Sequence, residues 1–329
     1  MRFGPVPVAG ALGAILAHRE VAGDLVLSKG HVLTKADLTA LASAGYTQIT
    51  VAQLDTGDVG EDIAAAVLAA ALVGAAPGLR LGTAATGRVN VIADTPGLAA
   101  LDAAALHALN RINPMITVAT VPDLHRMDAG GLVATIKIIA YAVPQADLDA
   151  ACAAGQGAIA LHHPQINRVA LVETRAGRDL GSKGERSLRI RLDRLGVGFA
   201  GRDLVDHDSA AIAAALAACD APLICILTGS ATSDLHDTAP EALRQAGGEV
   251  LHFGMPVDPG NLLFIGALGE RPVIGLPGCA RSPALNGADW VLERLLCGVA
   301  VTPDDIAAMG VGGLLKEIPS RPRPRRVAD

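Results

Sequence analysis

Two short segments combine glycine with hydroxyl residues, a composition suited to binding an anion such as a phosphate. The first contains Thr228, Gly229, Ser230, Thr232 and Asp237. The second contains Pro277, Gly278, Cys279, Arg281 and Ser282. Small residues let backbone amides approach an anion, and a helix N-terminus behind such a loop favours negative charge. Arg281 could add a charge-assisted contact to a phosphate.

Asp208 and Asp237 each stand just before an expected helix. A carboxylate in that position often caps the helix, a contribution of about 1 kcal/mol. The same oxygens could accept hydrogen bonds from a heterocycle rich in N–H groups or bind Mg²⁺. The spacing favours the capping role and leaves the ligand-binding role open.

The elements around these loops predict an open sheet. Apolar runs (RVALVET, LICIL, EVLHF, PVIGL) predict buried strands, and segments of about ten residues between them predict helices. This alternation predicts an α/β fold over residues 166–300, a three-layer α/β/α arrangement around a mostly parallel sheet. Ligands bind beyond the carboxyl ends of such strands, where the loops near residues 174, 206, 228 and 277 would meet.

The part of the chain before residue 166 shows a different pattern. We expect a small α+β region over residues 1–78, including a helix from Glu61 to Val73 and an N-cap at Thr34. Short β-branched runs predict a mixed, β-rich region over residues 79–165. Residues 301–329, rich in proline and arginine at their end, are expected to form a C-terminal tail or linker.

Composition narrows the class of protein. Of 329 residues, 51% are hydrophobic, only 2% are aromatic, and the formal net charge is −6. These values argue against a nucleic-acid partner, and no apolar stretch reaches the length of a membrane span. Five cysteines without a C-x-x-C pattern indicate reduced thiols and a cytoplasmic location. The sequence leaves the oligomeric state open, with a homodimer the commonest assembly.

Two apparent motifs carry little weight. Residues 196–201 match G-x-G-x-x-G, but they follow an expected helix, whereas a dinucleotide fingerprint follows a strand and opens a helix. His162 and His163 are adjacent, so their side chains would point apart on a strand. We therefore expect neither a dinucleotide site nor a metal pair there.

The loops resemble those of a known family, the molybdopterin-binding domain of molybdenum-cofactor biosynthesis proteins (the MogA, MoeA and gephyrin group). TGSAT followed by Asp237 resembles the family's T/S-G-G-x-S/G loop and Asp, and LPGCARS resembles its L-P-G-x-P-x-S loop. VDPGN, which contains Pro259 and Gly260, looks like the intervening loop, and Asp208 matches an Asp before the following helix. Ser230 replaces a glycine of the family pattern, and Ala280 replaces a proline. TRAGRDL, after the strand RVALVET, follows the family's T-G-D-E-L loop only loosely.

The resemblance extends over nearly the whole chain. GRVN and ATIKII are similar to stretches of a MoeA-like subgroup, some members of which continue into a molybdenum cofactor cytidylyltransferase domain. The resemblance implies a pterin ligand with a phosphate, molybdopterin or the molybdenum cofactor, and a cytidylyltransferase or molybdoenzyme as partner. It also makes Cys279 a candidate metal contact, since thiolates bind molybdenum or copper. The alternative for Cys279 is a small residue that fills a tight loop.

Two functions remain in competition, and a nucleotide-pyrophosphatase-like protein on a related fold is a third, more distant alternative. The first is a protein that binds the cofactor during its biosynthesis, handling or delivery. The second is a transferase that inserts molybdate or transfers an adenylyl group, using Mg²⁺ and a nucleotide. In that case Asp208 and Asp237 are the candidate catalytic residues and Mg²⁺ ligands, because phosphoryl charge must be neutralised by a metal.

Overall fold

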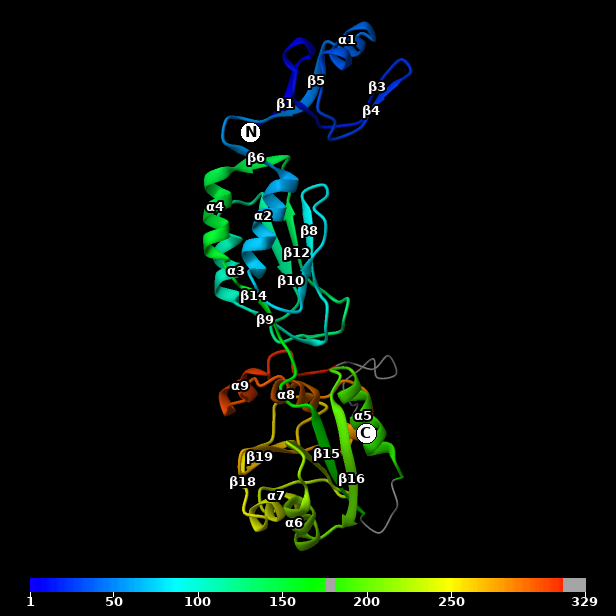
Figure 1. The fold of residues 1–329 in the computed structure, drawn as a ribbon, viewed down its shortest axis with the longest axis vertical. Coiled ribbons are helices and arrows are strands. Elements are labelled where there is room, and N and C mark those ends of the chain that lie inside the picture. Colours follow the sequence, from blue (N-terminus) through cyan, green and yellow to red (C-terminus); the bar gives the residue numbers. More distant parts are fainter. Residues whose placement is uncertain (176–180, 316–329) are drawn as a thin grey trace, which may run out of the picture. The chain divides into compact units, whose positions relative to one another are not determined.

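The structure is a computed structural model that describes residues 1–175 and 181–315 (Figure 1). The chain forms two compact units. The first unit comprises Met1–Thr95 and Ala99–Leu161, and the second comprises Pro96–Leu98 and the residues from His162 onward. In the described ranges, no helix has the length and apolar character needed to cross a membrane.

The first unit contains two hydrophobic cores, of which the N-terminal one lies between a small sheet and one helix. Its elements are β1 (Arg2–Pro7), η1 (Val8–Gly10), β2 (Ile15–Leu16), β3 (Glu20–Ala22), β4 (Leu25–Leu27), α1 (Lys35–Ser43) and β5 (Gln48–Gln53). The sheet order is β1-β5-β2, and β3 pairs with β4. Leu16, Leu41 and Val51 are buried in this core. The expected N-cap is confirmed, because the Asp37 amide donates to the Thr34 hydroxyl at 3.3 Å.

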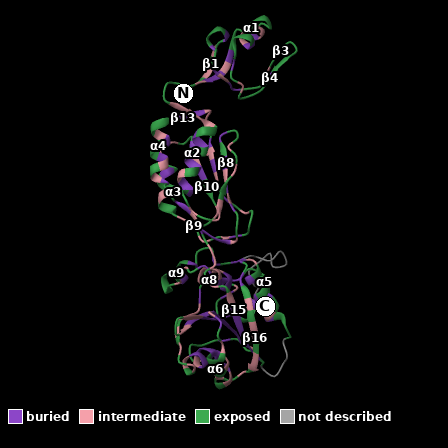
Figure 2. Ribbon diagram, in the orientation of Figure 1, coloured by how far each residue is buried: buried purple, intermediate pink, exposed green. Residues whose placement is uncertain are grey.

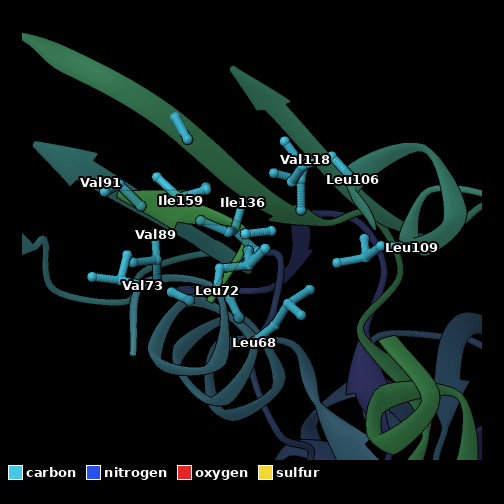
Figure 3. Packing of buried hydrophobic residues seen from close by; sticks show 14 of the residues in the cluster. Leu68, Leu72, Val73, Val89, Val91, Leu106, Leu109, Val118, Ile136 and Ile159 are labelled. Atoms are coloured by element: carbon cyan, nitrogen blue, oxygen red, sulfur yellow. The ribbon is translucent and has the colours of Figure 1, made fainter. Parts of the chain in front are cut away.

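The second core of this unit lies between helices and antiparallel strands. Its elements are β6 (Asp58–Gly60), α2 (Glu61–Val73), β7 (Leu79–Leu81), β8 (Arg88–Ala93), β9 (Gly97–Leu101), α3 (Ala103–Leu109), β10 (Ile116–Thr120), β11 (Arg126–Met127), β12 (Leu132–Ile138), β13 (Ala142–Pro144), α4 (Gln145–Ala154) and β14 (Ile159–His162). The expected helix from Glu61 to Val73 is confirmed as α2. Figure 3 shows Leu68 and Leu72 of α2 beside Val89 of β8 and Ile136 of β12.

The second unit is built around one six-stranded sheet. Its elements are β15 (Arg168–Arg175), α5 (Lys183–Asp193), β16 (Gly198–Asp206), α6 (Ser209–Ala218), β17 (Leu223–Leu227), α7 (Thr238–Gln245), β18 (Glu249–Phe253), β19 (Phe264–Leu268), β20 (Arg271–Gly275), η2 (Gly278–Arg281), α8 (Gly287–Leu296) and α9 (Pro303–Ala308). The sheet order is β16-β15-β17-β20-β19-β18. β15 is parallel to β16 and β17, and β17 is parallel to β20. β19 alone runs the other way, joined to β20 by a two-residue turn at Gly269 and Glu270.

Alternate side chains of the strands face two separate cores, as expected when both faces of a sheet are covered. On one face, Leu223 and Cys225 of β17 pack with α5 and α8. On the other face, Ile224 and Ile226 pack with α6 and α7. In Figure 2, β15 is largely buried, whereas the edge strand β16 is not. The predicted three-layer α/β fold with a mostly parallel sheet is thereby confirmed.

Part of the segment that we expected as a tail belongs to the second unit. Residues 303–308 form α9, which begins at the N-cap Thr302. Ile306, Met309 and Leu315 are buried in the core shared with α5 and α8. The proline- and arginine-rich residues 316–329 lie outside the described residues.

Candidate functional site

The loops singled out by sequence lie at one edge of the second unit's sheet. β15, β16, β17 and β20 are parallel, and Arg175 is paired with Asp206, Glu173 with Leu227, and Ile226 with Gly275. Their carboxyl ends therefore lie side by side, and the loops that follow them share this carboxyl edge. Residues 254–263 reach the same edge, because Phe253 and Gly275 both pair with Phe264.

The loop after β17 is held by hydroxyl groups. The Thr228 hydroxyl donates to the Ser230 carbonyl at 2.6 Å and lies 3.2 Å from the Thr232 hydroxyl. The Gly229 amide donates to the Thr174 hydroxyl at 2.8 Å, which ties the loop to β15. Thr228 and Thr232 are buried, whereas Ser230 is exposed. The loop thus has a fixed base and an open surface at Ser230.

His207 joins the same network. Thr174, which is buried, places its hydroxyl 2.9 Å from the His207 Nδ1 atom as well as within reach of the Gly229 amide. His207 belongs to the loop near residue 206 that the sequence predicts at this edge. Three consecutive elements of the carboxyl edge, at Thr174, His207 and Gly229, are therefore linked through one hydroxyl group.

Asp208 and Asp237 are both helix N-caps. The Ala211 amide donates to the Asp208 carboxylate at 2.9 Å at the start of α6. At the start of α7, the Asp237 carboxylate accepts from the Ser233 amide at 2.9 Å and the Thr238 amide at 2.7 Å. Burial alone would raise the pKa of Asp237, but these amides and the nearby His207 outweigh it and lower the pKa. Asp237 therefore carries a stabilised negative charge at this edge.

The loop after β20 is exposed at Gly278. Pro277 is buried and Gly278 is exposed at the start of η2. A methyl group added at Gly278 would meet only Arg281 Nη1, at 3.9 Å. Cys279 is also exposed, and the Asn286 side-chain amide donates to its sulfur at 3.0 Å. The Cys279 side chain does not fill the interior of a tight loop.

Arg281 connects the two loops. Its Nη2 atom donates to the Thr228 carbonyl at 2.9 Å and lies 3.4 Å from the Glu173 carboxylate. Its Nε atom is buried without a hydrogen-bond partner. Burial lowers the pKa of Arg281, and the charge of Glu173 opposes that shift. In this arrangement Arg281 braces the two loops against each other.

Glu173 is the residue at this edge that the sequence analysis missed. Its side chain is 1% exposed and binds both Arg281 and Arg202, the latter at 2.8 Å. A side chain at Gly184 would come within 2.8 Å of the Glu173 carboxylate, so α5 needs a glycine there. A carboxylate within the apolar run RVALVET was the sequence signal, because buried charges occur almost only when paired.

Pro259 and Gly260 support the start of α8. The Pro259 carbonyl accepts from the Gly287 amide at 2.8 Å. A side chain at Gly260 would lie 2.9 Å from that amide nitrogen. Both residues thus contact Gly287, which follows the loop that contains Ser282. Ser282 itself is exposed. The structure thus brings 228–237 and 277–282 together directly and places Pro259 and Gly260 as their support.

Two further cationic residues, Arg178 and Lys183, follow β15 in the sequence. Lys183 is exposed at the start of α5, whereas Arg178 lies outside the described residues. In the described ranges, no three His, Cys, Asp or Glu side chains form a group suited to a metal ion. The described part of this edge therefore contains no preformed Mg²⁺ site, and Mg²⁺ binding by Asp208 and Asp237 stays a prediction.

A hollow lies at the opposite, amino-terminal edge of the sheet. It has a volume of about 520 Å³. Its lining is Ile166, Pro222, Glu270, Arg271, Pro272, Leu295, Gly298, Val299 and Ala300. Ile166, Pro222 and residues 270–272 precede or begin strands, and Leu295 and residues 298–300 lie at or just after the end of α8, so none of the predicted loop residues lines the hollow.

Comparisons with known proteins give a family match only at the N-terminus. Residues 5–53 match a family described as "Domain of unknown function (DUF8806)". A search of curated proteins finds no match. The matched range coincides with the small N-terminal sheet and α1.

Several solved structures are similar to parts of the chain. A molybdopterin biosynthesis MoeA protein from Pyrococcus horikosii is 15% identical, with a TM-score of 0.32, over 90% of this chain and 75% of that one. A molybdopterin biosynthesis protein from Mycobacterium abscessus is 16% identical, with a TM-score of 0.29, over 40% of this chain and 92% of that one. At these identities and TM-scores, the likenesses carry no conclusion about the ligand of this chain.

Proposed function

We propose that the second unit binds molybdopterin or the molybdenum cofactor during its biosynthesis, handling or delivery. One observation carries the proposal: the two loops that resemble molybdopterin-binding loops follow neighbouring strands and are joined through Arg281 and the Thr228 carbonyl at 2.9 Å. Two segments that lie about fifty positions apart in the sequence form one surface at the edge where parallel α/β sheets bind ligands.

The chemistry of this surface suits both ends of such a ligand. Gly278 has open space around it, and Ser230 is exposed, so a phosphate could approach the loop backbone and the Ser230 hydroxyl. Asp237 holds a charged carboxylate that could accept hydrogen bonds from pterin N–H groups. We further propose a cytidylyltransferase or a molybdoenzyme as the protein that receives the ligand.

Calorimetric titration with purified molybdopterin tests the proposal. We expect binding with a dissociation constant of about 10 μM or lower, equivalent to about −7 kcal/mol. Molybdopterin from which the phosphate has been removed should bind at least about tenfold more weakly, because one charge-assisted interaction is lost. No heat of binding at about 100 μM molybdopterin would refute the proposal.

The same preparation separates handling from catalysis. Protein incubated with molybdopterin, molybdate, Mg²⁺ and ATP is assayed for adenylylated or molybdenum-containing product. A binding protein leaves the pterin unchanged. Turnover that disappears in Asp237→Asn would instead establish a molybdotransferase or adenylyltransferase.

A further inference from the structure

Arg191 lies behind the loop after β20 and contacts it through its backbone. The side chain comes from α5 and is 5% exposed. Its guanidinium donates to the carbonyls of Ala280 at 3.0 Å, Ser282 at 2.9 Å and Ala284 at 3.3 Å. Three alternate carbonyls of one loop thus converge on a single side chain from another element.

The other donors of Arg191 are also occupied. Its Nε atom pairs with the Asp289 carboxylate, and Nη1 reaches both the carbonyl and the hydroxyl of Ser187 on α5. Asp289, which is 2% exposed, accepts from the Asn286 amide at 2.8 Å with its other oxygen. Because Asn286 in turn donates to Cys279, the contacts run from α5 to the open surface of the loop.

We propose that Arg191, together with Asp289, is a positioning residue that sets the conformation of residues 279–286 for ligand binding. The guanidinium turns the carbonyls at 280, 282 and 284 inward, away from the surface that an anion would approach. An arginine suits this task because its planar fork offers five donors in fixed directions, which the single ammonium of a lysine cannot reproduce. Loop residues held from behind in this way keep a productive geometry without reorganisation on binding.

The negative charge of Asp289 compensates the buried positive charge of Arg191. An unpaired buried guanidinium would be costly, whereas a paired one with all its donors satisfied is tolerated. Arg191→Lys keeps a positive charge beside Asp289 but loses most of the bonds to the loop. This substitution therefore separates the positioning of the loop from the compensation of the buried charge.

Hydrogen–deuterium exchange of Arg191→Lys tests the proposal without any ligand. We expect the peptide 276–290 to exchange roughly tenfold faster than in the wild type, and the peptide 223–227 of β17 to be unchanged. Arg189→Lys is the matched control, since Arg189 lies on the same helix, exposed and paired with Glu185. It should leave both peptides at wild-type rates.

The second readout is molybdopterin affinity, which rests on the proposed function. Arg191→Lys should weaken binding roughly tenfold, as loss of an indirect positioning contact commonly does, and Arg189→Lys should not. If wild-type protein fails to bind molybdopterin, the proposed function fails while the exchange measurement still tests Arg191. Wild-type exchange of 276–290 in Arg191→Lys would overturn the inference.

Asp289→Asn guards against a variant that does not fold. Asparagine can still accept from the Asn286 amide and cap α8, but it removes the anionic anchor of Arg191. If circular dichroism shows Arg191→Lys to be unfolded, Asp289→Asn carries the test. Faster exchange confined to 276–290 in that variant supports the inference, and unchanged exchange there overturns it.

Discussion

The two edges of the second unit's sheet differ in what they could offer a ligand. The amino-terminal edge has a hollow of about 520 Å³, but its lining is mostly aliphatic, with Glu270 and Arg271 as the charged exceptions. The carboxyl edge has exposed Ser230 and Gly278 above a layer of paired buried charges at Glu173 and Arg191. The carboxyl edge is therefore the candidate site because it carries oriented polar groups, whereas the hollow at the amino-terminal edge is lined mostly by aliphatic side chains.

The largest expected effect comes from Glu173, the buried carboxylate of the carboxyl edge. Glu173→Gln leaves Arg202 and Arg281 without their counter-charge and should lower the free energy of unfolding by about 3 kcal/mol. Glu270→Gln at the exposed amino edge should change it by less than about 0.5 kcal/mol. Urea unfolding gives the free energy of unfolding of both variants. Equal values would contradict the expected difference between the two edges.

Bulk added at each edge is the next test. Ser230→Trp should weaken molybdopterin binding about a hundredfold because the indole occupies the surface of the loop, a loss of about 2.7 kcal/mol. Ala300→Trp places the same side chain at an exposed position of the amino-edge hollow and should leave the affinity unchanged. Calorimetry gives both values. The opposite ranking of the two variants would move the site to the amino edge.

A smaller effect is expected from the charge of Asp237. Asparagine caps a helix about as well as aspartate, so Asp237→Asn should cost less than about 0.5 kcal/mol of stability. The affinity for molybdopterin should nevertheless fall about tenfold, since a charged acceptor is lost. Asp208→Asn is the control for a second N-cap at the same edge. Unchanged molybdopterin affinity in both variants would mean that Asp208 and Asp237 act only as helix N-caps.

The smallest effect is the pH dependence of the Asp237 contribution to stability. Its pKa in the folded protein lies below the ordinary 3.8, so its ionised form stabilises the fold above that pH. The stability difference between wild type and Asp237→Asn should be constant from about pH 7 to pH 5 and shrink as the pH falls below about 4. Urea unfolding across this range measures it. A difference that grows in acid would contradict the assignment.

Local sequence pattern predicted much of the second unit. Apolar runs such as LICIL form strands that are buried on both faces of the sheet. Glycine and proline mark the loops that follow these strands, so β15, β17 and β20 were predictable. The reversed direction of β19 was not. It depends on the short turn at Gly269, where φ is +61°, rather than on the apolar pattern of the strand itself.

The loops of the candidate site were predictable, but the contacts that hold them were not. Glu173 and Arg281 are 108 positions apart, and Arg191 and Asp289 are 98 apart, so no local spacing links them. The one local signal is a charge at a core position. Arg191 stands on the same helical face as Leu188 and Leu192, as Glu173 stands within an apolar strand. A charged residue at a core position indicates that it has a partner of opposite charge, but the sequence does not identify which residue that is.

Hydrogen–deuterium exchange of the wild-type protein with and without molybdopterin tests the central claim most directly. If the carboxyl edge is the binding site, the ligand should slow exchange in residues 228–237 and 276–286. Residues 295–300, which border the hollow at the amino edge, should not respond. Slowing confined to residues 295–300, or no slowing at a concentration that saturates binding, would contradict the account.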